Sequence, residues 1–268
     1  MGRSMNVSPK INFIIPGVQK SATTALSRFL SSHPRLLMRA NEGHFFDRES
    51  EDWDRPNYSA YEEFAAVAEA GQLVGEKTPS YIFWPNAIER VFTYNPSMKF
   101  VTLLRNPVDR AFSHWKMVTQ RGVETNNFSD AIREGRKRVP VVPTDETAKA
   151  KRSFSYVERG FYSPQIETLW RFFPKEQTLF ILNEDLLNDP NTVFDKVCDF
   201  LSVDRFTTYP PQKIIRPNLN LAKGRAPGET KVTDMSESDR AHLAGIYRED
   251  ILTTQNLLKI DLSAWLAR

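Results

Sequence analysis

The segment Gly17-Val18-Gln19-Lys20-Ser21-Ala22-Thr23-Thr24 combines the residue types that bind phosphate-like anions. It lies between a short apolar run that ends at Pro16 and a stretch, beginning at Thr23, whose apolar residues have helical spacing. Backbone N–H groups at a helix N-terminus point outward, and the helix dipole favours negative charge there. We therefore predict an anion site with contacts from Lys20, Ser21, Ala22, Thr23 and Thr24.

This segment differs from the loop that binds nucleoside triphosphates. That loop has the pattern Gly-x-x-x-x-Gly-Lys-Ser/Thr. Here Lys20 is the third residue after Gly17, and no second glycine precedes it. Taken alone, the segment is equally compatible with an ordinary helix start beside a solvated lysine.

A second set of chemically useful residues is Leu104-Arg105-Asn106-Pro107-Val108-Asp109-Arg110-Ala111-Phe112-Ser113. It follows the clearest apolar run of the chain, and ligands of open α/β sheets bind at the carboxyl ends of the strands. Arg105 can hold a phosphate with two parallel hydrogen bonds, and Ser113 can add a hydroxyl donor from the following helix. Taken alone, Arg105 is more simply explained by an ion pair with Asp109.

Alternating strands and helices must position both segments. We predict strands at 11–16, 36–38, 72–76, 99–104 and 177–182. We predict helices at 23–32, 58–70, 86–94, 162–173, 190–201 and 236–258, and a further helix that begins at Pro107. This alternation indicates an α/β fold with a mostly parallel central sheet flanked by helices. No linker divides the strands, so we expect a tail at 1–10 and a single domain at 11–268.

In two stretches, the apolar residues show no clear helical or strand periodicity. Residues 133–152 contain Arg136-Lys137-Arg138, two prolines and little apolar periodicity, which predicts a surface loop. This basic stretch is either a solvated face or a lid that recognises an anionic acceptor. Residues 210–227 are also irregular.

The two anion segments lie at separate strand-to-helix junctions, which suits a nucleotide with phosphates at its 5′ and 3′ ends. The chain resembles the sulfotransferases that use 3′-phosphoadenosine 5′-phosphosulfate (PAPS). It is most similar to their heparan sulfate glucosaminyl N- and O-sulfotransferase branch and its bacterial relatives. Gly17–Thr24 resembles the 5′-phosphosulfate loop, and Arg105–Ser113 matches the 3′-phosphate motif Arg-Asn-Pro-x-x-Arg-x-x-Ser. The resemblance implies a sulfotransferase fold related to that of P-loop nucleoside triphosphatases.

Further stretches extend the resemblance in order along the chain. They are Asn41–Asp47, Glu76–Tyr81, the block from Gly160 to Leu186, and Lys223-Gly224-Arg225. The first resembles the segment that carries the catalytic glutamate of the family, and the last resembles the loop that closes over the donor. The chain departs from the family at Ala22, where glycine is usual, and it lacks the late cysteine pair of the animal enzymes.

The resemblance implies a role for several residues. Glu42 would be the general base that takes the proton of the acceptor hydroxyl or amine. Lys20 would stabilise the oxygen from which the sulfuryl group departs, and Lys77 would assist at that group or orient Glu42. PAPS would be the donor and adenosine 3′,5′-bisphosphate the product, with no metal. Besides the two anion segments, the nucleotide contacts would come from Lys223, Gly224 and Arg225.

The acceptor side is expected to contain His44, Tyr81 and Trp84. Partial burial beside Phe45 and Phe46 would raise the pKa of Glu42 and make it a better base. The acceptor itself stays open among sugars, lipid-linked glycans, polyketides and aryl alcohols.

Two other functions fit part of the sequence. One is a small-molecule kinase with a degenerate phosphate loop, which would prefer ATP with magnesium. The other is a non-catalytic protein that binds anions or glycans on the same scaffold. The missing second glycine argues against the kinase, and the presence of Glu42, Lys20 and Lys77 argues against the binding protein.

The composition of the chain excludes several classes of protein. The chain has 268 residues, of which 40% are hydrophobic and 26% charged, and this excludes a disordered or collagen-like chain. A net charge of +3 is too small to indicate nucleic-acid binding. No apolar run is long enough for a membrane span, and Cys198 is the single cysteine. We expect a cytoplasmic enzyme that acts on a carbohydrate or small metabolite.

Overall fold

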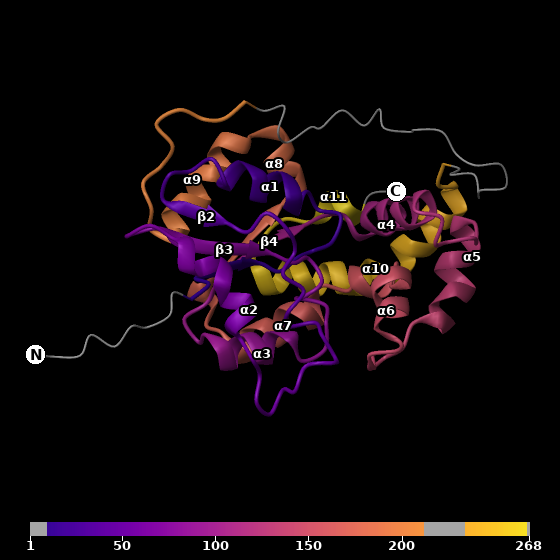
Figure 1. The fold of residues 1–268 in the computed structure, drawn as a ribbon. Helices are drawn as coiled ribbons and strands as arrows, with labels where there is room; N and C mark the ends of the chain where they lie inside the picture. The colour runs from indigo at the N-terminus through magenta and orange to yellow at the C-terminus, as the bar shows by residue number, and fades with distance from the viewer. Residues whose placement is uncertain (1–9, 212–233, 267–268) are drawn as a thin grey trace, which may run out of the picture.

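A parallel sheet forms the centre of the molecule. The computed structural model describes residues 10–211 and 234–266. In this part of the chain, five strands form one sheet in the order β2-β3-β1-β4-β5, and all neighbours are parallel (Figure 1). The strands are β1 (Phe13–Ile15), β2 (Leu36–Met38), β3 (Leu73–Lys77), β4 (Lys99–Leu104) and β5 (Thr178–Leu182). The predicted α/β fold with a parallel central sheet is confirmed.

One face of the sheet packs against helices from two distant parts of the chain. These helices are α1 (Thr23–Leu30), α8 (Asn183–Asn188) and α9 (Pro190–Leu201) (Figure 1). Phe13 and Leu103 are fully buried in one apolar cluster with Phe29 of α1 and Phe194 of α9. Successive side chains of a strand point to opposite faces of the sheet. The strand residues next to Phe13 and Leu103 in the sequence therefore face the helices on the other side.

The opposite face carries the larger core. The helical elements on this face are α2 (Ser59–Glu62), η1 (Glu63–Val67), α3 (Ala87–Tyr94), α7 (Ser163–Phe172) and η4 (Lys175–Gln177). Ile14 and Phe100 point to this side and lie in one cluster with Val91 of α3 and Ile166 of α7. Burial on both faces explains why the strands are nearly continuous apolar runs.

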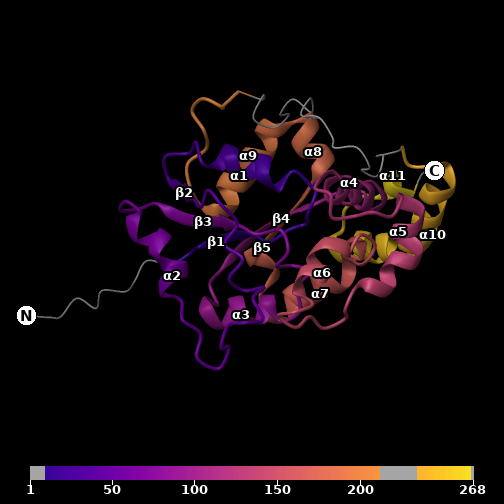
Figure 2. The same cartoon turned by 45° about the vertical axis from the view of Figure 1, so that its right-hand side comes forward.

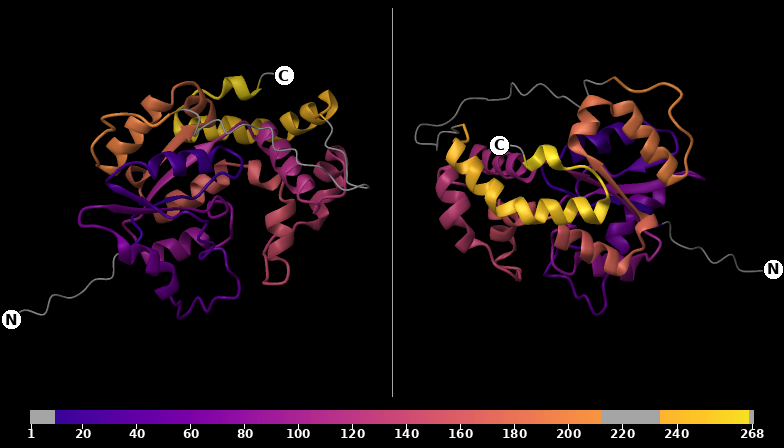
Figure 3. Two further views of the ribbon diagram at one scale, coloured as in Figure 1. Left: turned by 45° about the horizontal axis from the view of Figure 1, so that its top comes forward. Right: turned by 180° about the vertical axis from the view of Figure 1, so that it is seen from behind.

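A group of helices lies beside the sheet, beyond the end of β4 (Figure 2). It comprises α4 (Pro107–Gln120), α5 (Phe128–Arg133), η2 (Glu134–Arg138), α6 (Ala148–Phe154), η3 (Glu158–Gly160), α10 (Glu237–Leu258) and α11 (Ser263–Leu266). The long helix α10 packs on both α4 and α7, and so joins this group to the sheet (Figure 3). The Asn106 side chain accepts a hydrogen bond from the Val108 N–H at 3.0 Å, which fixes the start of α4.

Most predicted boundaries agree with the structure within two residues. The predicted helix at 58–70 is instead split into α2 and η1. The helices α5, α6, α8 and α11 had no counterpart among the predictions, because they are short and lack a full amphipathic repeat.

The prediction that residues 133–152 form a surface loop is wrong at both ends, where η2 and α6 occur. Polar contacts rather than an apolar period hold this stretch. Arg138 pairs with the buried carboxylate of Glu124 at 2.7 Å, and Lys151 donates to the Pro140 carbonyl at 2.9 Å. Such contacts leave no periodic signal in the sequence.

Two searches of the described residues gave negative results. No helix in residues 10–211 and 234–266 is long and apolar enough to cross a membrane. In the same ranges, no group of three or more His, Cys, Asp or Glu residues is placed to hold a metal ion.

A buried carboxylate lies on β3, next to the cavity described below. Glu76 is fully buried beside the rings of Tyr61 and Tyr81. A Cβ at Gly43 would lie 2.0 Å from Glu76 Oε2, so glycine is required there. Burial raises the pKa of Glu76 to about 7, and the two tyrosines oppose only part of that shift.

Glu76→Gln should remove a pH dependence of folding stability. The native carboxyl keeps its proton up to about pH 7, whereas the unfolded carboxyl ionises near 4.5, so wild-type stability falls as pH rises through this interval. At alkaline pH the variant should be more stable by up to ~3 kcal/mol, and near pH ~4 the two proteins should match. Urea unfolding across this range measures the difference. Parallel pH profiles for the two proteins would contradict the assignment.

Candidate active site

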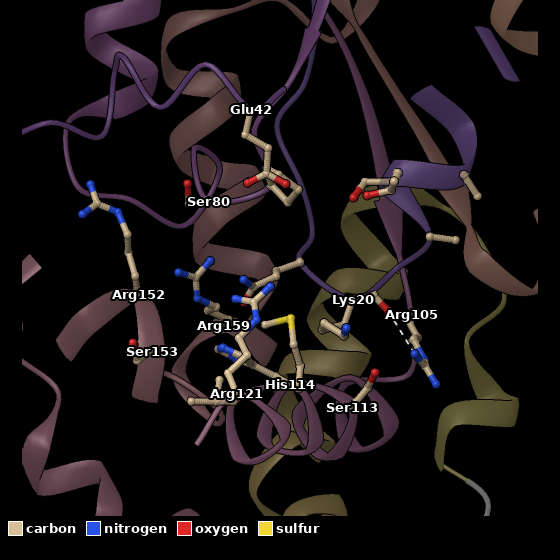
Figure 4. Close-up of a pocket in the computed structure, with 18 of the residues that line it drawn as sticks. Lys20, Glu42, Ser80, Arg105, Ser113, His114, Arg121, Arg152, Ser153 and Arg159 are labelled. Carbon is tan, nitrogen blue, oxygen red and sulfur yellow. Dashed lines mark hydrogen bonds between the residues drawn. The ribbon is translucent and has the colours of Figure 1, made fainter. Parts of the chain in front are cut away.

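A cavity of about 590 Å³ opens at the carboxyl ends of the central strands. Its walls come from the loop after β1 with helix α1, the segments after β2 and β3, helices α4 and α6, and η3 (Figure 4). This is the edge at which open parallel sheets bind ligands. Six Lys or Arg residues line it against one carboxylate, that of Glu42. The cavity is therefore built for an anion.

The loop after β1 is held against the sheet by backbone hydrogen bonds. Val18 N–H donates to the Leu103 carbonyl at 2.7 Å, and Leu103 N–H donates to the Gly17 carbonyl at 2.9 Å. A Cβ on Gly17 would lie 2.4 Å from the Ile82 side chain, so this close approach requires glycine. The loop then delivers Lys20, Thr23 and Thr24 to the cavity wall.

The start of α1 offers unsatisfied donors to the cavity. Its N-cap is Ala22, which makes no side-chain cap hydrogen bond, so the first N–H groups of α1 lack that partner. Ala22 has φ 63°, a left-handed conformation that favours glycine. The Ser21 hydroxyl is buried without a partner among the described residues, and Ser21 lies behind the cavity wall rather than on it. The orphan N–H groups at the start of α1 fit a phosphate or sulfate group.

Arg105 connects the two predicted anion segments. Its Nη1 donates to the Lys20 carbonyl at 2.9 Å (Figure 4). Asp109 pairs with Arg240 at 3.1 Å instead, so the alternative of an Arg105–Asp109 ion pair is not seen. Ser113 lies in α4, on the same wall as Arg105. Burial lowers the pKa of Lys20, and the positive charges of Arg121 and Arg105 lower it further.

Lys77 joins the donor loop to the predicted base. Its Nζ contacts Glu42 Oε1 at 2.7 Å and donates to Thr24 Oγ1 at 3.2 Å. The ammonium is almost completely buried at the end of β3. Lys77 makes no ion pair with its chain neighbour Glu76, since its ammonium is directed to Glu42. The contact places Lys77 beside Glu42; its role, to assist at the sulfuryl group or to orient Glu42, stays a prediction.

His44 lies between two carboxylates. Its Nε2 is 3.0 Å from Glu42 Oε2, and its Nδ1 is 2.9 Å from Asp47 Oδ2. Carboxylates only accept hydrogen bonds, so both ring nitrogens carry protons. Asp47, followed by Glu42, raises the pKa of His44 to about 9. Asp47 is fully buried, and it also accepts from the Ser80 hydroxyl at 2.6 Å.

The expected rise in the pKa of Glu42 does not occur. Burial acts to raise it, but hydrogen bonds from His44 and Lys77 outweigh burial and hold the pKa of Glu42 below its ordinary value. The two phenylalanines that follow His44 pack into the core. Glu42 is therefore ionised at neutral pH, which is the form that a proton acceptor needs.

Comparison with known proteins agrees with this geometry. The profile of the sulfotransferase domain matches residues 10–216. The chain belongs to the sulfotransferase family. It is 33% identical over 196 residues to mouse heparan sulfate glucosamine 3-O-sulfotransferase 6, covering 73% of this chain and 53% of that protein. It therefore spans about half the length of such curated relatives.

Other relatives extend the similarity over nearly the whole chain. This sulfotransferase is 28% identical to the human bifunctional heparan sulfate N-deacetylase/N-sulfotransferase 3, over 92% of this chain and 29% of that protein. A solved sulfotransferase from Alicyclobacillus acidocaldarius is 25% identical, with a TM-score of 0.78 over 96% of this chain and 99% of that one. The expected sulfotransferase fold is confirmed.

Several predicted site residues of this sulfotransferase do not lie on the cavity wall. Tyr81 and Trp84 are buried: the Tyr81 hydroxyl accepts from Phe45 N–H at 2.8 Å, and Trp84 Nε1 donates to Glu49 at 2.6 Å. This corrects the expectation that the two rings contact the acceptor. The predicted donor contacts at 223–225 lie outside the described residues.

Other polar cavity residues were not among the site residues predicted from the sequence. They are Gln19, Arg28, Ser80, His114, Arg121, Arg152, Ser153 and Arg159. Arg159 immediately precedes the Gly160 block of the family resemblance, which was the available signal for it. Arg28, His114, Arg152 and Ser153 lie on helices, and Gln19, Ser80 and Arg121 lie in turns; which of these side chains face the cavity depends on tertiary packing.

His44→Gln should destabilise the sulfotransferase in a pH-dependent way. The pKa of His44 is higher in the folded state, so its contribution is complete below about pH 6.5 and is lost as pH rises through about 9. Urea unfolding of both proteins from about pH 6 to about pH 10 measures this difference. A destabilisation that does not change with pH would show that the charge of His44 is not the cause.

Proposed function

We propose that this sulfotransferase transfers the sulfuryl group of PAPS to a hydroxyl or amine of a carbohydrate or small-metabolite acceptor. The observation that carries the proposal is the contact of one lysine with both halves of the cavity. Lys77 binds the Glu42 carboxylate and the Thr24 hydroxyl of the anion loop. A proton acceptor and an anion cradle are thereby fixed next to each other.

The donor side matches a nucleotide with two separated anionic groups. Lys20 and the uncapped start of α1 would hold the 5′-phosphosulfate, and Arg105 with Ser113 would hold the 3′-phosphate. The donor supplies a sulfuryl group bound to a good leaving group. Because a sulfuryl group carries less charge than a phosphoryl group, side-chain cations can meet the electrostatic demand.

In the transfer step, a new bond forms between sulfur and the acceptor oxygen or nitrogen. The bond from sulfur to the 5′-phosphate oxygen breaks, and that oxygen keeps the electron pair. Lys20 stabilises the charge that develops there. Glu42 takes the acceptor proton, while Lys77 and His44 hold its carboxylate in place. Adenosine 3′,5′-bisphosphate and the sulfated acceptor leave.

The first test is nucleotide selectivity. The chain should bind adenosine 3′,5′-bisphosphate far more tightly than ATP, and without magnesium, because its two anion sites are separated. Calorimetry with both nucleotides measures this. Arg105→Ala should weaken the bisphosphate by roughly 2–5 kcal/mol, whereas Arg240→Ala, outside the cavity, should leave its affinity unchanged. Equal affinity for ATP, or a magnesium requirement, would favour a kinase.

The second test separates the roles of Glu42 and Lys20. Glu42→Gln should leave donor binding intact and lower turnover by roughly 10²–10⁴, the usual contribution of a positioned base. Lys20→Ala should lower both donor affinity and turnover, because Lys20 lies in the donor loop. Donor binding by calorimetry and sulfate transfer across an acceptor panel provide the two readouts. Unchanged turnover in Glu42→Gln would remove Glu42 from the chemistry and place the general base elsewhere. Intact donor binding without any sulfate transfer by the wild type would favour a non-catalytic scaffold.

A further inference from the structure

A buried guanidinium faces the acceptor side of the cavity. Arg159, in η3, is only 2% exposed but lines the cavity wall. Its Nε and Nη1 atoms are buried without a hydrogen-bond partner among the described residues. Within the described residues, its guanidinium carbon lies over the ring of Phe83, 4.7 Å from the ring centroid. A buried arginine without an acidic partner is costly, so its retention needs an explanation.

The nearest carboxylates are already engaged by other cations. Glu42 is held by Lys77 and His44, as described above. Asp47 is held by His44 and by Arg152, whose Nε lies 3.5 Å from Asp47 Oδ2. Neither carboxylate makes a hydrogen bond or ion pair with Arg159 within the described part of the chain. The charge of Arg159 is therefore not neutralised locally.

Two neighbours add to the unsatisfied polar groups. Arg110 is fully buried, and its Nε and Nη1 also lack partners among the described residues. His114 lines the cavity, and both of its ring nitrogens are also buried without a hydrogen-bond partner among the described residues. Burial holds the pKa of His114 well below its usual range, so its ring is neutral and offers one donor and one acceptor. Arg159 and His114 lie on the cavity wall, whereas the buried Arg110 is not among the residues that line it and adds positive charge behind that wall. The wall therefore suits a negatively charged, hydrogen-bonding ligand.

The position of Arg159 separates it from the donor contacts. Figure 4 shows Arg159 between Glu42 and His114, with Arg152 and Ser153 toward one side and Lys20 toward the other. The charges that most affect Arg159 are those of Arg110, Asp47, Arg152 and Glu42. Arg159 thus lies with the proton acceptor rather than with the nucleotide loop.

We infer that Arg159, assisted by Arg152, binds an anionic group of the acceptor next to the hydroxyl or amine that Glu42 deprotonates. The group is a carboxylate, sulfate ester or phosphate ester, since each can accept two hydrogen bonds from a guanidinium. This inference rests on the proposed function and specifies its acceptor class. An acceptor without such a group would leave Arg159 buried and unpaired, so Arg159 determines specificity.

The test uses inorganic sulfate as the probe, in protein saturated with adenosine 3′,5′-bisphosphate. Wild type should bind sulfate by calorimetry, at an ionic strength matched with chloride. Arg159→Gln should weaken this binding at least about tenfold, and Arg159→Lys should weaken it less, because charged hydrogen bonds are lost in the first variant and partly kept in the second. The nucleotide affinity of each variant reports whether it is folded; if Arg159→Gln fails this check, Arg159→Lys alone is compared with wild type.

Two matched variants locate the bound sulfate. Arg136→Gln removes an arginine that pairs with Glu158 at the surface, and sulfate affinity should not change. Lys20→Ala should also leave sulfate affinity largely unchanged, because the inferred position is separate from the donor loop. If sulfate binding depends on Lys20 and not on Arg159, the ion occupies the sulfuryl position of the donor and the inference is wrong.

Two further results would overturn the inference. If wild type with bound nucleotide takes up no sulfate beyond the chloride control, the acceptor-side anion site does not exist. If adenosine 3′,5′-bisphosphate itself fails to bind, the proposed function fails and the inference fails with it. Because nucleotide binding is measured first, the two failures are distinguishable.

Discussion

The buried ammonium of Lys77 fixes the relation between the two halves of the cavity. It is held at the end of β3 and touches both the Glu42 carboxylate and the Thr24 hydroxyl. Register between β1 and β3 aligns Ile15 with Lys77, so the pairing of the strands sets this contact. A shift of one residue would turn Lys77 to the other face of the sheet. The parallel sheet therefore positions the chemistry through its register, not only by supporting the loops.

The cavity concentrates positive charge in a chain whose net charge is small. Six cations and one carboxylate line it, although the whole chain has a net charge of only +3. Several basic residues elsewhere in the described chain are paired, as Arg138 is with Glu124 and Arg90 with Glu49. Buried charges that lack partners reduce folding stability. Their placement at one edge of the sheet is explained if an anionic ligand supplies the missing partners, since binding to the native state then stabilises it.

Much of the fold and of the anion sites could be predicted from the sequence. The strands are apolar runs bounded by turn residues, and parallel strands bring their carboxyl ends to one edge. That rule alone places Lys20 and Arg105 together, and the structure joins them by a hydrogen bond. The assignment of Tyr81 and Trp84 to the acceptor was wrong because an aromatic residue near a motif gives no information on its direction. Both rings instead fill the core behind the motif.

The lowered pKa of Glu42 and the position of Arg159 could not be predicted from the sequence, and the reason is the same for both. Each depends on groups that tertiary packing brings from distant positions: Lys77 and His44 around Glu42, and Phe83 beside Arg159. Local burial would make Glu42 a stronger base, yet its two partners lower its pKa and keep it ionised. Proton transfer to so stabilised a carboxylate is favourable only when the acceptor hydroxyl becomes more acidic, as it does when its bond to sulfur forms. In the proposed reaction, the arrangement would therefore couple deprotonation to sulfuryl transfer, and it would disfavour a free alkoxide in the cavity before the donor reacts.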